Sequence, residues 1–127
     1  MHQQFSIFVT KAPYDSRNNE SALQFCYAAT SSGHTIVQVF FYAAAVHTAS
    51  NLLLPNSDEV NQREGWKRFA NKHQVPLNVC TTAGARRGIV TQDDNLAFDN
   101  YDPAFSPVGM IEYFAALKAN NFIGIQF

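Results

Sequence analysis

Nearly uninterrupted apolar segments recur along this chain, and they restrict it to a small set of folds. The clearest of them are "FSIFVT" (5–10), "TIVQVFFY" (35–42), "PLNVC" (76–80) and "NFIGIQF" (121–127). Their β-branched and aromatic residues favour strands. The segment 35–42 is almost wholly apolar, which is typical of a strand that is covered on both faces. The sequence therefore predicts a sheet buried between two further layers.

Helical segments separate the predicted strands. We expect helices over residues 20–33, 43–53, 58–74 and 107–120. Gly33 stands where a C-terminal cap belongs, Ser57 or Asp58 can cap the third helix, and Pro107 fits the first turn of the fourth. Strands that alternate with helices imply right-handed crossovers. The predicted fold is a single-domain, three-layer α/β/α structure over residues 1–127, with a mainly parallel sheet of about five strands.

Two segments near the middle of the chain are less regular. "TTAGARRGIV" (81–90) is expected to hold a turn and a short helix. The polar stretch 91–107, with scattered aromatic residues, is expected to form a surface loop. Its acidic pair, Asp93 and Asp94, is interpreted as part of a solvated face.

Composition and charge narrow the class of function. The formal net charge of -1 argues against a broad electrostatic grip on nucleic acid. The stretch 35–57 is long enough to raise the question of a membrane span, but Gln38, His47 and Pro55 interrupt it, so a strand and a short helix are favoured. The N-terminal residues lack the basic start and long apolar run of a signal peptide. A reducing cytoplasm is therefore expected, where a notable cysteine is more often catalytic than structural.

Cys80 closes the third predicted strand and precedes the pair Arg86 and Arg87. In an open parallel sheet, ligands and chemistry collect beyond the carboxyl ends of the strands. A helix or turn that begins just after Cys80 would point backbone N–H groups at its sulfur and favour the thiolate, which is the nucleophilic form. The alternative is an inert core residue, because free cysteine is among the most buried residue types.

Other candidate residues give weaker signals. Cys26 lies in the middle of a predicted helix on its apolar face, so it is interpreted as structural. The four histidines show no metal-ligand spacing with the cysteines, and the six glycines form no phosphate-binding loop. Neither a metal nor an organic cofactor is therefore expected. His47 follows the second strand and can share a rim of the sheet with Cys80.

With these features assembled, the chain resembles the DsrE-like family of sulfur-relay proteins nearly from end to end. The resemblance rests on "FVTKAPYDS", "SALQFCYAA", "VQVFFYAAAVHTASNLL", "SDEVNQREGWKRFANKHQVPLNVCTTAGARRGIV" and the closing "IQF". The most specific element is "LNVCTTAGARRGIV", in which the sulfur-accepting cysteine of the family falls on Cys80. One departure is the segment "ANNFIGIQF", where family members commonly carry charged residues.

The resemblance implies a sulfurtransferase in which Cys80 takes sulfur as a persulfide from a TusA-like donor and passes it to a TusE-like acceptor. It also implies a cytoplasmic heterohexamer with TusB-like and TusC-like subunits, with no membrane and no direct nucleic-acid contact. The sulfur would serve 2-thiolation of a tRNA wobble uridine, or dissimilatory sulfur oxidation as in related complexes. Arg86 and Arg87 would stabilise negative sulfur or guide an acidic partner, unless they form structural salt bridges.

Two interpretations from other classes stay open at this point. The first is a non-catalytic assembly subunit with an inert Cys80, because related subunits of such complexes can lack a working cysteine. The second is a small-ligand-binding domain of flavodoxin-like form, against which the missing phosphate loop argues.

Overall fold

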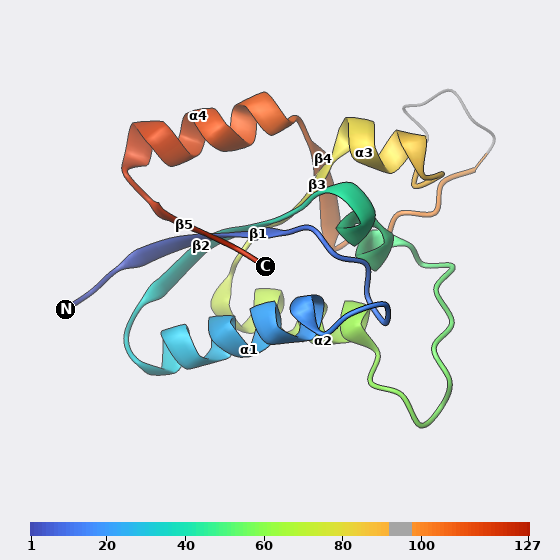
Figure 1. The fold of residues 1–127 in the computed structure, drawn as a ribbon, viewed down its shortest axis with the longest axis horizontal. Coiled ribbons are helices and arrows are strands. Elements are labelled where there is room, and N and C mark those ends of the chain that lie inside the picture. Colours follow the sequence, from blue (N-terminus) through green and yellow to red (C-terminus); the bar gives the residue numbers. More distant parts are fainter. Residues whose placement is uncertain (92–97) are drawn as a thin grey trace.

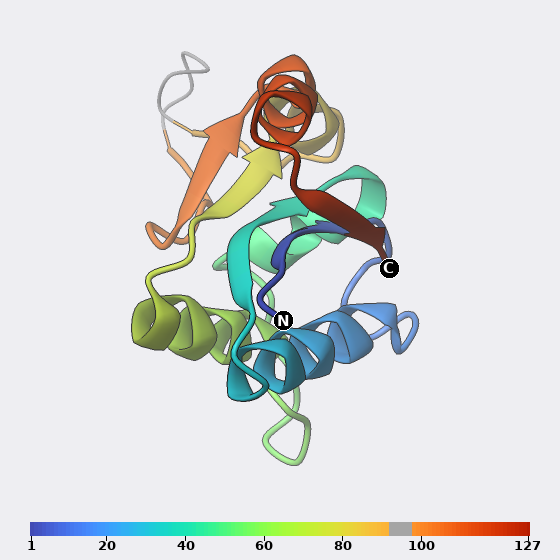
Figure 2. The same ribbon diagram turned by 90° about the vertical axis from the view of Figure 1, so that its left-hand side faces the viewer.

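Five parallel strands form one sheet in the part of the chain that the structure, a computed structural model, describes: residues 1–91 and 98–127. The strand order is β4-β3-β2-β1-β5 (Figures 1 and 2). The strands are β1 (Gln4–Val9), β2 (Thr35–Phe41), β3 (Leu77–Cys80), β4 (Phe105–Val108) and β5 (Ile123–Gln126). All four strand pairings are parallel, which confirms the predicted sheet. The predicted acidic pair, Asp93 and Asp94, lies outside the described residues.

Helices cover both faces of the sheet, as the three-layer prediction requires. Figure 1 shows α1 (Asn18–Ser31) and α2 (Gln62–His73) on one side, with α3 (Thr81–Arg86) and α4 (Met110–Asn120) on the other. A 3-10 helix, η1 (Ala43–Ala49), follows β2, so the predicted helix over 43–53 is shorter and more tightly wound than expected. No helix among the described residues is long and apolar enough to cross a membrane.

The packing of strand β2 on both faces of the sheet explains why its sequence does not alternate between apolar and polar residues. Phe41 packs edge-on against Trp66 of α2, with ring centroids 5.3 Å apart. Its neighbour Phe40 points to the opposite face and stacks on Tyr113 of α4 at 4.6 Å. Both phenylalanines are fully buried. Because successive strand residues face opposite layers, a strand that is covered on both sides needs apolar residues at consecutive positions.

A buried polar chain joins α1, α2 and η1 on the Trp66 side of the sheet. The Trp66 indole N–H donates to Asn19 Oδ1 at 2.7 Å, and Asn19 Nδ2 donates to Thr48 Oγ1 at 2.9 Å. All three side chains are fully buried. Since a buried polar group without a partner destabilises the fold, these two hydrogen bonds fix how the three helices pack together.

Strand β4 overturns the interpretation of residues 91–107 as a surface loop that ends where a helix starts at Pro107. Residues Phe105–Val108 pair with β3, with Pro107 opposite Val79, and the helix begins only at Met110. Strand β4 lies at the edge of the sheet. A proline is tolerated in an edge strand because its missing N–H is not needed by a second neighbour.

The helix caps were predicted with mixed success. Gly33 has φ +88°, its N–H donates to Thr30, and the next N–H, of His34, donates to Ala29. This double pattern is a Schellman cap and confirms the prediction for Gly33. The prediction of Ser57 or Asp58 as the cap of α2 was wrong. Asn61 caps it, accepting a hydrogen bond from the Glu64 N–H at 3.1 Å, because an asparagine amide serves a helix start equally well.

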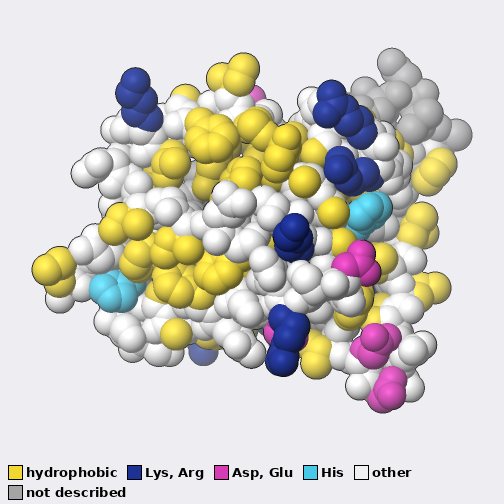
Figure 3. Space-filling view, viewed as in Figure 1, with side chains coloured by type: hydrophobic (Ala, Val, Ile, Leu, Met, Phe, Trp, Pro, Cys, Tyr) yellow, Lys and Arg dark blue, Asp and Glu magenta, His cyan; other side chains and the backbone are white. Residues whose placement is uncertain are grey.

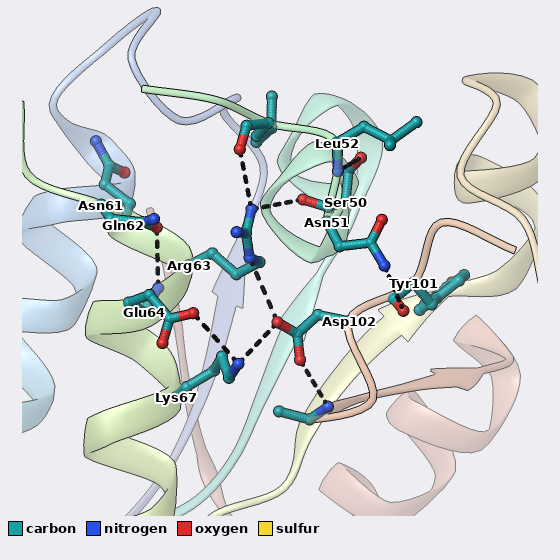
Figure 4. Close-up of polar contacts among 12 residues, drawn as sticks. Ser50, Asn51, Leu52, Asn61, Gln62, Arg63, Glu64, Lys67, Tyr101 and Asp102 are labelled. Carbon is teal, nitrogen blue, oxygen red and sulfur yellow. Dashed lines mark hydrogen bonds and ion pairs between the residues drawn. The ribbon is translucent and has the colours of Figure 1, made fainter. Parts of the chain in front are cut away.

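Asp102 ties α2 to the segment that leads into β4 (Figure 4). Its Oδ2 lies 2.9 Å from Lys67 Nζ and 3.4 Å from Arg63 Nε, and its Oδ1 accepts from the Ala104 N–H. The Arg63 guanidinium also donates to the Ser50 carbonyl at 2.7 Å. Burial acts to raise the pKa of Asp102. The hydrogen bonds from Ala104 and Lys67 and the two positive charges outweigh it, so the pKa is lowered.

Candidate functional site

Cys80 stands at the junction of β3 and α3, with no loop between the two elements. It is the N-cap of α3, and its Sγ accepts a hydrogen bond from the Ala83 N–H at 3.5 Å. The expected short helix after Cys80 is thereby confirmed. Only 3% of the residue is exposed. The sulfur is therefore held in the protein wall rather than on an open surface.

A pocket of about 260 Å³ opens beside this sulfur. Its lining residues follow three neighbouring strands at their carboxyl ends, and they are Tyr42, Ala43, Cys80, Thr82, Ala83, Arg86, Arg87 and Met110. Since β2, β3 and β4 are adjacent and parallel, their ends meet at one edge of the sheet. The structure thus brings Cys80, Arg86 and Arg87 together around one cavity, and their roles stay a prediction.

The two arginines give the pocket a positive wall. Arg87 Nη1 donates to the Ala83 carbonyl at 3.2 Å, which holds this side chain against α3. Within residues 1–91 and 98–127, no ion pair involves Arg86 or Arg87. The alternative of structural salt bridges therefore finds no support in this part of the chain. Figure 3 shows basic side chains over the region of α3, whereas most of the acidic side chains on that face lie lower in the view.

Tyr42 and Ala43 are pocket residues that the sequence interpretation missed. The Tyr42 ring stacks on Phe8 at 5.6 Å, which restrains its position. Ala43 has φ +54°, a left-handed conformation that costs an alanine about 1 kcal/mol and is found at functional sites. The signal that indicated Cys80 also applies to these two residues, because both directly follow the carboxyl end of a strand.

His47 and Cys26 lie apart from the pocket. His47 is on η1, which packs against α3, but it does not line the cavity. Cys26 is fully buried in α1, on the opposite side of the sheet from α3 (Figure 1). Burial raises the pKa of the Cys26 thiol to about 12. These observations fit the interpretation of Cys26 as a structural residue.

Cys26 is expected to resist alkylation in the native protein. With its pKa raised to about 12 from 9.0, the thiolate fraction near pH 8 falls about a thousandfold below that of the unfolded chain. Native and urea-unfolded protein would be treated with iodoacetamide, and the rate of labelling at Cys26 would be read by peptide mass spectrometry. Labelling of Cys26 in the native protein at the unfolded rate would contradict its assignment to the core.

Other features of the described residues offer less chemistry. A wider hollow of about 450 Å³ lies between the segments 14–20 and 59–62, and neither a cysteine nor a histidine lines it. No group of three or more His, Cys, Asp or Glu side chains in the described ranges is arranged to hold a metal ion. The pocket beside Cys80 is therefore the candidate site.

Comparisons with known proteins agree on one family. The DsrE/DsrF-like family matches residues 3–123. Sulfurtransferase TusD of Salmonella newport (strain SL254) is 36% identical over 110 residues, which cover 84% of this chain and 86% of that protein. The match confirms the family that the sequence resembles.

Two solved structures share the fold. The crystal structure of the ychN protein from E. coli superposes with a TM-score of 0.77 at 18% identity, covering 98% of this chain and 99% of that chain. The structure of MTH1491, a protein of unknown function from Methanobacterium thermoautotrophicum, gives a TM-score of 0.73 at 7% identity, with the same coverage. At such identities these likenesses concern the fold alone.

Proposed function

Since the chain belongs to the DsrE/DsrF-like family, we propose that it carries sulfur as a persulfide on Cys80. The similarity to a TusD sulfurtransferase supports a sulfur-transfer function. The single observation that carries the assignment to Cys80 is its position at the end of β3, where it lines a pocket together with two arginines. Cys26 offers no such access, because it is fully buried.

The proposed chemistry is thiol exchange in two steps. The Cys80 thiolate attacks the outer sulfur of a donor persulfide, the S–S bond of the donor breaks, and the donor leaves as a thiolate. The thiolate of the next carrier then attacks the outer sulfur on Cys80, and the Cys80 thiolate leaves. Arg86 and Arg87 stabilise the negative sulfur in both states. No oxidant or reductant is consumed, because each step breaks one S–S bond and forms another.

The wider pathway is part of the same proposal. The donor is a TusA-like carrier, the acceptor is a TusE-like carrier, and the sulfur serves 2-thiolation of a tRNA wobble uridine in the cytoplasm. TusB-like and TusC-like subunits complete a heterohexamer. Exposed apolar side chains support the need for partner subunits, since Ile111 and Phe114 of α4 are 87% and 47% exposed. Figure 3 shows hydrophobic side chains gathered over the region of α4.

Mass spectrometry under non-reducing conditions tests the proposal. The protein would be incubated with a cysteine desulfurase, cysteine, a TusA-like carrier and the partner subunits. We expect one added sulfur on the peptide that contains Cys80, removable by a reductant, and none on the peptide that contains Cys26. If no sulfur reaches Cys80, the chain is instead a non-catalytic assembly subunit.

A dissimilatory role is separated from tRNA thiolation by the fate of the sulfur. In cells that lack this protein, we expect the thiolated wobble uridine to disappear from tRNA hydrolysates and to return on complementation. Unchanged thiolation in those cells would favour a carrier for sulfur oxidation.

A further inference from the structure

The charge of the side chains around the Cys80 pocket indicates which kind of ligand the pocket can bind. Among the residues that the structure describes, its lining includes Arg86 and Arg87 and no acidic residue. Two arginines outside the pocket form ion pairs in the described ranges: Arg17 pairs with Glu20, and Arg63 pairs with Asp102. Arg86 and Arg87 have no such counter-charge there. A pocket with uncompensated positive charge beside a nucleophile favours an anionic ligand.

The size of the pocket limits what that ligand can be. Its volume of about 260 Å³ is below the range of about 300–1,000 Å³ that is usual for drug-sized ligands. Water occupies about 30 Å³ per molecule in the liquid, so the cavity has room for a small ion with a few waters. Tyr42 and Thr82, whose side chains carry hydroxyl groups, are also lining residues. These features fit a compact oxyanion better than an organic cofactor.

We infer that the pocket binds small oxyanions that carry a transferable sulfur, of which thiosulfate is the simplest, and that Cys80 is loaded from them directly. This inference rests on the proposed function of Cys80 as a sulfur acceptor. It proposes a low-molecular-weight sulfur donor in addition to the TusA-like carrier protein. Guanidinium groups match the geometry of such ligands, because their N–H donors pair with two oxygens of one anion.

The loading step balances without a further reagent. The Cys80 thiolate attacks the terminal sulfur of thiosulfate, and a new S–S bond forms as the S–S bond of thiosulfate breaks. The electron pair of the broken bond leaves with sulfite. The total charge is unchanged, since a thiolate and a dianion give a persulfide anion and a dianion. Arg86 and Arg87 hold the oxygens of the bound anion and of the departing sulfite.

Direct loading is tested on the full chain with thiosulfate alone. We expect added sulfur on the Cys80 peptide and release of sulfite in equal amount. The Arg86→Gln and Arg87→Gln variants should each lose about tenfold in the second-order rate. Arg87→Lys, which keeps the charge, should lose less than about threefold. The matched control is Lys72→Gln, which removes one positive charge from the exposed end of α2 and should react as the wild type does.

A pair of alkylating reagents separates anion binding from the reactivity of the thiol. Iodoacetate and iodoacetamide react with a thiolate in the same way, but only iodoacetate is an anion. We expect the ratio of their rates at Cys80 to fall about tenfold in each glutamine variant, with the iodoacetamide rate nearly unchanged. An equal decrease with both reagents would assign the arginines to the thiol or to the fold, and the inference would then be wrong.

Failure of this inference and failure of the proposed function give different results. If the carrier protein loads Cys80 and thiosulfate does not, the oxyanion site is wrong and the relay role stands. If neither donor loads Cys80, both are wrong. An unchanged rate of loading by thiosulfate in the Arg86→Gln and Arg87→Gln variants would also overturn the inference, because the arginines would then not bind the anion.

Discussion

Replacing Cys80 by serine is expected to abolish sulfur transfer and to leave the fold intact. A serine hydroxyl does not form a persulfide by thiol exchange, so delivery of sulfur to the downstream carrier should fall at least about a thousandfold. Serine is also a favoured N-cap, and its Oγ can accept the hydrogen bond that the Ala83 N–H gives to Cys80. The loss would therefore be chemical rather than structural.

The measurement follows labelled sulfur from a cysteine desulfurase to the downstream carrier in the presence of all partner subunits. Circular dichroism would verify that Cys80→Ser unfolds within a few degrees of the wild type. The control is Cys26→Ala, which loses some stability from the core but should keep transfer within about twofold. Full transfer by the Cys80→Ser variant would show that this chain assembles the complex and does not carry the sulfur.

Replacing Asp102 by asparagine is expected to lower the free energy of unfolding by about 2–4 kcal/mol. The change removes the anion of Arg63 and leaves Lys67 paired with Glu64 alone, at 3.3 Å. Loss of one member of a buried ion pair costs about 3–5 kcal/mol. The side chains of Asp102 and Arg63 are only 7% and 12% exposed. Lys67 is 31% exposed, so water compensates part of its loss, and the expected cost falls from about 3–5 kcal/mol to about 2–4 kcal/mol.

The effect of Asp102 should depend on pH in one direction. The folded protein lowers the pKa of this carboxyl group from its ordinary value, which is about 3.9 in an unfolded chain. Its contribution is therefore complete above that value and is lost as the pH falls through the lower, folded pKa. Urea unfolding of the wild type and the Asp102→Asn variant should differ most near neutral pH and converge in strong acid.

The control for Asp102 is Asp58→Asn, since Asp58 is an exposed carboxylate. We expect that variant to unfold within about 0.5 kcal/mol of the wild type at either pH. An equal difference between Asp102→Asn and the wild type at neutral and acid pH would contradict an electrostatic role for Asp102.

The four strands with strong apolar segments were predictable from the sequence, and the fifth was not. Strand β4 has a proline, and Ser106 and Pro107 are both exposed. Nothing in this short segment distinguishes it from a loop. It is a strand because β3 offers a free edge beside it, with Asn78 opposite Ser106. Such pairing is a property of the assembled sheet rather than of local propensity.

The candidate site was predictable in part for a related reason. Cys80, Arg86 and Arg87 are close in sequence, so the end of one strand was enough to indicate them. Tyr42 and Met110 reach the same pocket only because β2 and β4 flank β3 in the sheet. The order of strands in space does not follow from their order in the chain, so the sequence did not indicate that these two residues share a pocket with Cys80.

The placement of Cys80 in the wall of its pocket affects what a partner protein meets. A persulfide adds a second sulfur about 2 Å beyond Sγ, so the cargo stands in the cavity while its anchor remains enclosed. The empty protein presents almost no sulfur to a passing thiol. On the proposed function, the loaded protein would extend a reactive atom into the pocket. Accessibility itself would then report whether there is sulfur to transfer, and the unloaded thiol would be shielded from unproductive disulfides.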